Sequence, residues 1–257
     1  MLKKDEIVIG FIGIGVMGKS MAGHLLSGGY PLYVYTRTKE KASDLLERGA
    51  EWVESPAEIA ARANVIFTII GYPSDVEEVY LGAEGLIPNG KAGTYLIDMT
   101  TSTPTLAKKI YEEAKRKDMH AMDAPVSGGD IGAREGKLAI MAGGDREDFE
   151  AIKPLFQLMG TNIILQGGAG AGQHTKMCNQ IAIATNMIGV IEAVVYAEKS
   201  GLDPERVLET ITTGAAGSWS LSNLAPRVIK GDFNPGFMIK HFIKDMTIAL
   251  DEAEKWV

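Results

Sequence analysis

Six residues near the N-terminus have the spacing of a nucleotide-binding turn. They read Gly13-Ile14-Gly15-Val16-Met17-Gly18 and directly follow the apolar run at residues 7–12. In a G-x-G-x-x-G turn, one glycine makes the tight turn, one lets the backbone approach a pyrophosphate, and one lets the helix pack on the strand. The free N–H groups of the helix start then bind the phosphates. A glycine-rich turn without a ligand is the alternative, and the strand-then-helix context favours the dinucleotide.

The segment after the second predicted strand distinguishes NAD from NADP. A site for NAD places Asp or Glu there, about 20 residues beyond the glycines, to bind the ribose 2′-hydroxyl. This chain instead has Thr36-Arg37-Thr38, followed by Lys39, and no carboxylate. Arg37 can bind a 2′-phosphate, with Thr38 and Lys39 as further donors. We therefore predict NADP (NADPH) as the cofactor in preference to NAD, with a solvated basic turn as the alternative.

A hydroxyl and two glycines follow another predicted strand. The stretch from Asp123 to Gly129 places Ser127, Gly128 and Gly129 just past the strand at residues 119–123. Open α/β sheets bind ligands at the carboxyl ends of their strands. A hydroxyl beside two backbone N–H groups suits a substrate carboxylate. A tight turn without a ligand is the alternative.

Lys176, Asn179 and Gln180 share one face of a helix that begins near Gln173, because residues at i, i+3 and i+4 are neighbours on a helix. The residues that follow are mostly apolar, so these polar side chains are expected to face the domain junction. A partly desolvated lysine has a lowered pKa and can act as a general acid or base. The alternative is a Lys176 that only extends its ammonium to solvent from the first helical turn.

The first two-thirds of the chain alternate between strand and helix patterns. Short apolar runs rich in β-branched residues predict strands buried on both faces. Ser55-Pro56 and Thr103-Pro104 predict helix starts. The fold class is therefore predicted as α/β, with a doubly wound, Rossmann-type sheet. Strands are predicted at 6–12, 31–35, 64–70, 94–98, 119–123, 138–142 and 162–165, and helices near 17–27, 39–48, 56–62, 74–80, 104–117 and 146–158.

The pattern changes at the glycine-rich run 167–172, after which only helices are predicted. We therefore predict a dinucleotide-binding domain at 1–166 and an all-helical C-terminal domain at 167–257 for substrate binding and oligomerisation. Its last helix ends without Gly, Pro or a cap, so we expect this domain to be incomplete at its C-terminus. The helices are predicted at 173–200, 203–212, 219–229 and 237–257.

Composition excludes several classes of protein. The 257 residues are 46% apolar and 23% charged, as in soluble globular proteins, and the net charge of −7 argues against nucleic-acid binding. Cys178, expected to be buried, is the single cysteine, which indicates a reducing cytoplasm. We interpret the apolar stretch 181–197 as a buried helix that is too short and too polar to span a bilayer. The four histidines have no metal-ligand spacing, and no metal is predicted.

Together these motifs resemble those of the β-hydroxyacid dehydrogenase family, which includes 3-hydroxyisobutyrate dehydrogenase, tartronate semialdehyde reductase and the glyoxylate/succinic semialdehyde reductases. The resemblance rests on residues 10–18, 123–129, 170–180 and Lys244-Asp245, in order over nearly the whole chain. It implies an NAD(P)-dependent enzyme that interconverts a short semialdehyde or 2-oxo acid and its hydroxy acid by hydride transfer.

The resemblance also implies a role for each matching residue. Lys176 would be the catalytic acid/base, and Asn179 and Gln180 would bind the substrate. Many members have a second Asn at the place of Gln180, so the pocket size is open. The substrate carboxylate would be held by Ser127, Gly128 and Gly129. The cofactor would also be contacted by Tyr72, Pro73, Thr101 and Lys244.

Several functional alternatives remain at this point. Thr36-Arg37-Thr38 resembles the NADPH-using reductases more than the NAD-using hydroxyisobutyrate dehydrogenases. An NAD-dependent 3-hydroxyisobutyrate dehydrogenase, a non-catalytic NADP-binding or interaction module, and an imine-reducing relative are the other candidates. The last of these tends to lack the lysine. We expect a small carboxylate-bearing substrate, no nucleic-acid or membrane partner, and a homo-oligomer, either a dimer or a tetramer.

Overall fold

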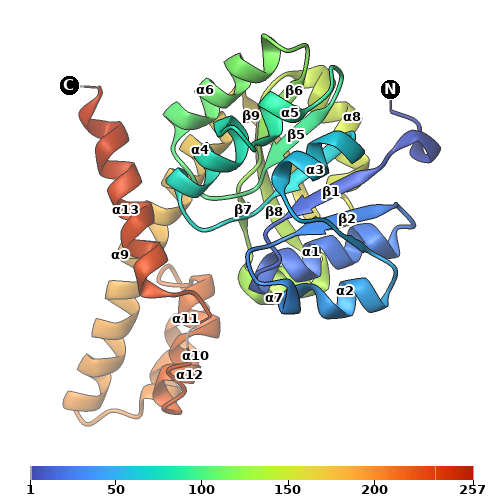
Figure 1. The fold of residues 1–257 in the computed structure, drawn as a ribbon. Helices are drawn as coiled ribbons and strands as arrows, with labels where there is room; N and C mark the ends of the chain where they lie inside the picture. Colours follow the sequence, from blue (N-terminus) through green and yellow to red (C-terminus); the bar gives the residue numbers. More distant parts are fainter. Residues whose placement is uncertain (1, 235, 257) are drawn as a thin grey trace. The chain divides into compact units, whose positions relative to one another are not determined.

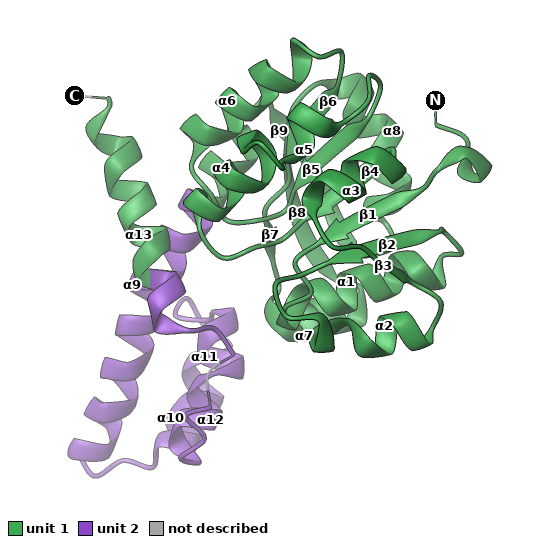
Figure 2. Cartoon of the chain, in the orientation of Figure 1, with its two compact units in different colours: residues 1–176, 243–257 green, residues 177–242 purple. Residues whose placement is uncertain are grey.

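The structure is a computed structural model that describes residues 2–234 and 236–256. The chain forms two compact units, residues 1–176 with 243–257 and residues 177–242 (Figure 2). The first compact unit thus extends to Lys176, past the predicted domain boundary at 166/167. That domain boundary stays a prediction.

The end of the chain belongs to the first unit because of specific polar contacts. The Thr105 hydroxyl donates to the Glu252 carboxylate at 2.8 Å, and Lys255 Nζ donates to Thr105 Oγ1 at 2.8 Å. These contacts join the last helix to the helix at Pro104–Lys115, which connects two neighbouring strands of the sheet in the first unit. The sequence pattern contains no sign of this return.

A mostly parallel sheet forms the middle of the first unit (Figure 1). Its strand order is β3-β2-β1-β4-β5-β6-β8-β7, with β9 paired to β8. Neighbours from β3 to β6 are parallel, and the order reverses at β1, between β2 and β4. Ligands bind at such a switch point in open α/β sheets. The strands are β1 (Ile9–Ile12), β2 (Leu32–Tyr35), β3 (Glu51–Trp52), β4 (Val65–Thr68), β5 (Tyr95–Asp98), β6 (His120–Asp123), β7 (Val126–Ser127), β8 (Leu138–Gly143) and β9 (Gly160–Gly167).

Helices cover both faces of the sheet because its central strands are apolar on both faces. In β1, Phe11 packs into one core cluster and Ile12 into the other. One cluster includes residues of α1, α2, α7 and α8, and the other includes residues of α3, α4, α5 and α6. The helices are α1 (Val16–Ser27), α2 (Ser43–Glu47), α3 (Pro56–Arg62), α4 (Pro73–Leu81), α5 (Leu86–Asn89), α6 (Pro104–Lys115), α7 (Gly129–Glu135) and α8 (Arg146–Phe156), with short 3₁₀ turns η1 (Lys4–Glu6) and η2 (Lys39–Ala42).

Two predicted helix starts are confirmed in detail. The Ser55 hydroxyl accepts a hydrogen bond from the Glu58 N–H at 3.2 Å, and Thr103 Oγ1 accepts one from the Leu106 N–H at 3.1 Å. A proline follows each cap at the first helical position. Its missing N–H costs nothing there, because that group has no partner inside a helix.

The last part of the sheet departs from the simple parallel pattern. β6 and β7 both pair antiparallel with β8, and β9 pairs parallel with β8. The chain bends at Ala124-Pro125, continues as β7, and returns through α7 in a wide hairpin. Apolar periodicity does not report strand direction, and β3, β7 and α5 are too short to be seen in it. The helix α7 was missed because it begins after Gly128, without a capping side chain or a proline to mark its start.

The long helix α9 (Ala171–Lys199) begins in the first unit and continues into the second. The second unit has its own small core, which includes Val190, Leu208 and Leu221. The single helix predicted at 219–229 is in fact two, because Pro226 has no N–H to continue the ladder. The remaining helices are α10 (Pro204–Ile211), α11 (Trp219–Asn223), α12 (Ala225–Ile229) and α13 (Ile239–Glu254). The last helix, predicted at 237–257, thus ends at Glu254 and gives way to a turn at 255–256; residue 257 lies outside the described residues.

The apolar stretch 181–197 lies within α9, and the prediction that it is a buried helix, too short and too polar to span a bilayer, is wrong. Within residues 2–234 and 236–256, α9 is the one helix long and apolar enough to cross a membrane by length and composition, and only 22% of its most apolar window is buried. Ile188 and Tyr196 are 60% and 74% exposed. Cys178 is exposed as well. The helix therefore presents apolar side chains to solvent in this chain.

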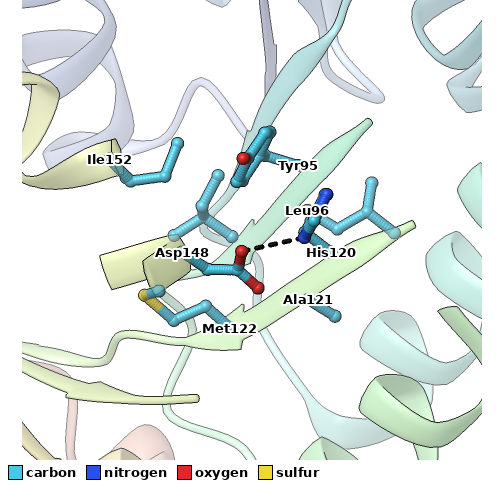
Figure 3. Close-up of a pocket in the computed structure, with 8 residues that line it drawn as sticks. Tyr95, Leu96, His120, Ala121, Met122, Asp148 and Ile152 are labelled. Carbon is cyan, nitrogen blue, oxygen red and sulfur yellow. Dashed lines mark ion pairs between the residues drawn. The ribbon is translucent and has the colours of Figure 1, made fainter. Parts of the chain in front are cut away.

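A polar cluster stabilises the amino ends of β5 and β6 (Figure 3). His120 Nδ1 lies 2.8 Å from Asp148 Oδ1, and the Tyr95 and His120 rings stack with centroids 4.3 Å apart. Burial raises the pKa of the Asp148 carboxyl. The cluster joins α8 to the sheet at the end opposite to the glycine turn.

The glycine turn yields a prediction about stability. A Cβ at Gly18 would overlap the Gly13 carbonyl oxygen, whereas a Cβ at Gly15 would meet nothing within 4 Å. We expect Gly18→Ala to lower the free energy of unfolding by about 1–3 kcal/mol. The matched change Gly15→Ala should stay within about 0.5 kcal/mol of the parent. Urea denaturation of the protein without ligand measures both, and equal stability of the two variants would contradict the close approach of α1 to β1.

Candidate active site

The G-x-G-x-x-G segment forms the turn from β1 into α1. Gly13 has φ 101°, in the left-handed region, and its N–H donates to the Tyr35 carbonyl of β2 at 2.9 Å. Gly15 precedes α1 and makes no side-chain capping hydrogen bond. The first N–H groups of α1 therefore point out of the helix without a side-chain cap, as an anion site requires.

The turn has the space that a pyrophosphate needs. Nothing lies within 4 Å of the position a Cβ would take at Gly15. Beside it, Ile14 is buried and packs into the core, whereas Val16 is 78% exposed. The backbone between them forms an open cradle at the end of a buried strand, and these residues fit a dinucleotide.

The segment after β2 contains a feature that the sequence analysis missed. The Arg37 guanidinium is 80% exposed and lies 3.6 Å from Asp75 Oδ1 of α4. Lys39 Nζ lies over the Trp52 ring, 5.2 Å from its centroid. Residues 36–39, directly after β2, contain no carboxylate, but the fold brings Asp75 there. The strand order explains this, since α4 follows β4 and both β2 and β4 flank β1.

Lys176 is a buried amine in the first turns of α9. Its side chain is 7% exposed, and its Nζ donates to the Val126 carbonyl oxygen at 2.8 Å. Burial lowers the pKa of Lys176 to about 8; the Asp245 carboxylate opposes this shift and the Lys244 ammonium adds to it. An amine in this state can give and take a proton near neutral pH.

The Ser-Gly-Gly stretch adjoins this lysine. Ser127 ends β7 directly after Val126, the acceptor of the Lys176 hydrogen bond. Gly128 and Gly129 have φ 131° and 62°, a backbone that residues with a Cβ rarely adopt. Two motifs far apart in the sequence thus come together in the first unit.

The start of α13 contributes a second lysine to the first unit. Lys244 Nζ donates to the Thr101 carbonyl at 2.6 Å and lies 3.0 Å from Asp245 Oδ1. Both side chains act electrostatically on Lys176. The structure therefore brings Thr101, Lys176 and Lys244 into one region, although 143 residues separate Thr101 from Lys244.

The remaining predicted site residues lie as follows. Tyr72 precedes Pro73 at the start of α4 and is 38% exposed. In the second unit, Asn179 Nδ2 donates to Gln180 Oε1 at 2.7 Å, which orients both amides. Thr36 is half-buried and Thr38 is exposed. The proposed roles of these residues stay predictions.

Two buried carboxylates were not assigned roles by sequence reasoning. Asp98 and Asp123 are paired in register at the carboxyl ends of β5 and β6. Burial raises the pKa of each to about 6, against hydrogen bonds that favour the ionised form. Their position at strand ends was the available signal. Within the described part of the chain, no group of three or more His, Cys, Asp or Glu residues is arranged to hold a metal ion.

The fold and the turn define a Rossmann-type dinucleotide-binding protein. Two family models match the chain, the NAD binding domain of 6-phosphogluconate dehydrogenase over residues 8–168 and the NAD-binding domain of NADP-dependent 3-hydroxyisobutyrate dehydrogenase over residues 170–256. The chain belongs to the β-hydroxyacid dehydrogenase family, as its motifs predicted, and is an NAD(P)-dependent hydroxyacid dehydrogenase.

Individual relatives are similar over nearly the whole chain. The uncharacterised oxidoreductase YkwC of Bacillus subtilis is 68% identical, over 96% of this chain and 85% of the relative. The 2-hydroxy-3-oxopropionate reductase of Escherichia coli is 42% identical, over 96% of this chain and 84% of the reductase. Among solved structures, 3-hydroxyisobutyrate dehydrogenase of Mycobacterium tuberculosis with L-serine has a TM-score of 0.87 and 30% identity. The match covers 97% of this chain and 87% of the dehydrogenase chain. These similarities confirm the predicted fold class and enzyme class.

Proposed function

We propose that the protein is an NADPH-dependent reductase of a short semialdehyde or 2-oxo acid that carries a carboxylate, with Lys176 as the general acid. In the reverse direction the enzyme oxidises the corresponding hydroxy acid. The supporting observation is the buried Lys176 Nζ, 2.8 Å from the Val126 carbonyl and next to the Ser127 turn.

Lys176 is suited to both directions of proton transfer. With a pKa of about 8, the amine is mostly protonated at neutral pH and still releases its proton readily. As a carbonyl is reduced, the ammonium donates its proton to the developing alkoxide. In oxidation, the neutral amine takes the proton from the alcohol. The Val126 carbonyl fixes Nζ in both states, which limits the entropy lost in reaching the transition state.

The Ser127 turn is assigned to the substrate carboxylate. The Ser127 hydroxyl and the N–H groups of Gly128 and Gly129 offer donors at one bend of the chain, where both glycines are exposed. Asn179 follows Lys176 by three residues on α9, so its amide is on the same helix face. We assign Asn179 and Gln180 to the substrate as well. This donor set favours small, singly charged acids.

The cofactor is assigned to the carboxyl ends of the central strands, where the glycine turn lies. When bound, the reduced nicotinamide supplies a hydride to the carbonyl carbon. The turn from Gly13 to Gly18 would hold the pyrophosphate. The nicotinamide end would be bordered by Tyr72, Pro73, Thr101 and Lys244.

The preference for NADP rests on Arg37. Its exposed guanidinium can form a paired hydrogen bond with a 2′-phosphate, and Thr36 and Thr38 flank it. The family model over residues 170–256 describes an NADP-dependent enzyme. Asp75 acts against this preference, because its carboxylate pairs with Arg37 and repels a phosphate. That carboxylate favours an NAD-dependent 3-hydroxyisobutyrate dehydrogenase as the second candidate.

We also propose a cytoplasmic homo-oligomer, a dimer or a tetramer, rather than a membrane protein. The exposed apolar side chains of α9 support a protein partner for this helix. Polar residues interrupt the face, among them Asn186 and Glu192. In a symmetric oligomer, a second copy of this chain would bring its own α9, and the same apolar face of the two copies could pack together.

The role of Lys176 predicts a pH profile and a mutant effect. The kcat for reduction should be level below about pH 8 and fall above it, and the kcat for oxidation should rise to a plateau above about pH 8, because the two directions need opposite protonation states. Lys176→Ala should lower kcat by roughly 10²–10⁴-fold and leave NADPH affinity nearly unchanged. Steady-state rates with succinic, methylmalonate and tartronate semialdehydes and glyoxylate measure this.

Lys176→Arg serves as the control for charge. It keeps a positive group but cannot release a proton at these pH values, so it should be as slow as the alanine variant. Turnover near the parent rate in either variant would exclude Lys176 as the acid.

The cofactor assignment predicts opposite effects at two positions. Arg37→Asp should lower the ratio of kcat/KM for NADPH to that for NADH by about 10- to 100-fold, since it removes a charged hydrogen bond and adds a repulsive charge. Asp75→Asn should raise the ratio, because the guanidinium loses its competing partner. Lys41→Asp makes the same charge change at another exposed position and should leave the ratio unchanged. An unchanged ratio in Arg37→Asp would contradict the NADP assignment.

A further inference from the structure

We propose that Gln173 is a positioning residue for the reaction: its carboxamide joins the helix turn before Lys176 to the loop that contains Thr101, so that the proton donor and the cofactor side keep a fixed spacing. The inference rests on the proposed role of Lys176 as general acid. All of the contacts that carry it lie within the first unit.

Both ends of the Gln173 amide are used by one loop. Nε2 donates to the Thr100 carbonyl at 2.7 Å, and Oε1 accepts from the Ser102 N–H at 3.0 Å. The side chain is fully buried. These two bonds satisfy the backbone on either side of Thr101, the residue whose carbonyl accepts from Lys244. The loop between β5 and α6 is therefore fixed to α9.

The helix start that carries Gln173 is itself held by Asp123. The Asp123 carboxylate accepts from the Gly170 N–H at 2.7 Å and from the Gln173 N–H at 2.8 Å. It thus caps the N-terminus of α9 from the end of β6. A Cβ at Gly172 would collide with the Met141 carbonyl, so the turn also packs tightly on β8.

Lys176 follows Gln173 by three residues, nearly one helical turn, and lies on the same helix face. The ammonium is directed to Val126 on one side. The Gln173 amide is directed to the loop at residues 100–102 on the other. A shift of that loop relative to α9 would change the spacing between Lys176, the proposed proton donor, and the cofactor side at Thr101, from which the hydride would come. Displacements of about 1 Å can cost 10²-fold in rate.

An amide is the side chain that this place requires. It donates and accepts at the same time, whereas an ionised carboxylate only accepts. Glutamate at this position would face the Thr100 carbonyl with a negative oxygen. Protonated glutamic acid, in contrast, reproduces both bonds, since its O–H can donate to Thr100 while its carbonyl accepts from Ser102.

The test is the pH dependence of Gln173→Glu relative to the parent enzyme. The charged groups on the same loop and helix start are Asp98, which accepts from the Thr100 N–H, Asp123, which accepts from the Gln173 N–H, and Lys244, which donates to the Thr101 carbonyl. Lys176 lies three residues further along α9, and Asp245 adjoins Lys244. At about pH 8, we expect kcat for reduction to be roughly 10- to 100-fold below the parent value. At about pH 5, where the buried acid is protonated, the ratio should return to within about threefold of one. Gln157→Glu, at an exposed position, is the control and should give a ratio of one throughout.

Gln173→Met separates positioning from packing. It has a similar length but neither donor nor acceptor, so its loss of kcat should persist at every pH. We expect the apparent pKa in its pH–kcat profile to stay near 8, because methionine leaves Lys176 buried and only the spacing of the loop changes. The KM for NADPH should change little. Thermal unfolding of each variant confirms that rates are measured on folded protein, and Gln173→Glu at low pH serves if Gln173→Met does not fold.

The possible outcomes separate the positioning role of Gln173 from the general-acid role of Lys176. A Gln173→Glu ratio near one at all pH values, with Lys176→Ala inactive, would overturn the positioning role and leave the general acid in place. A ratio that stays low at acid pH would also overturn it, because the protonated side chain restores both hydrogen bonds. Full activity of Lys176→Ala would overturn the proposed function, and this inference with it.

Discussion

The burial of one amine is the constraint on which the proposed chemistry depends. Lys176 loses most of its hydration in the first turns of α9 and gains one carbonyl partner, Val126. This one hydrogen bond does not make up for the lost hydration of the ammonium, so the pKa of Lys176 falls into the range where the amine exchanges protons near neutral pH. Asp245 opposes the shift and keeps the charged form accessible. In the proposed mechanism, an amine in a wetter site would have a higher pKa and would take up and release a proton less readily near neutral pH.

The rest of the first unit serves to keep that amine dry and in place. The parallel sheet ends its strands at one edge, so the glycine turn after β1, the loop after β5 and the bend after β6 all reach the same side. Asp123 holds the start of α9, and the loop after β5 contacts Gln173 and Lys244. The contacts of Lys176, Thr101 and Lys244 therefore follow from the topology of one sheet.

Much of this was accessible from the sequence, for reasons that differ between elements. Buried parallel strands and proline-marked helix starts have strong local signals, which is why β1, β4, α3 and α6 were predicted closely. The approach of Asp75 to Arg37, the return of the chain end to Thr105, and the direction of β8 are long-range outcomes without a local signal. The apolar α9 was read as buried because periodicity cannot distinguish a core helix from one with an apolar surface.

The central claim is that Lys176 is a desolvated acid rather than a permanent cation. Its ionisation is measured most directly by NMR titration of labelled lysine side chains in the intact protein, with Lys176→Arg used to assign the signal. We predict a midpoint near 8 for Lys176, because burial lowers its pKa to about that value. A midpoint at the ordinary lysine value, near 10.5, would contradict it.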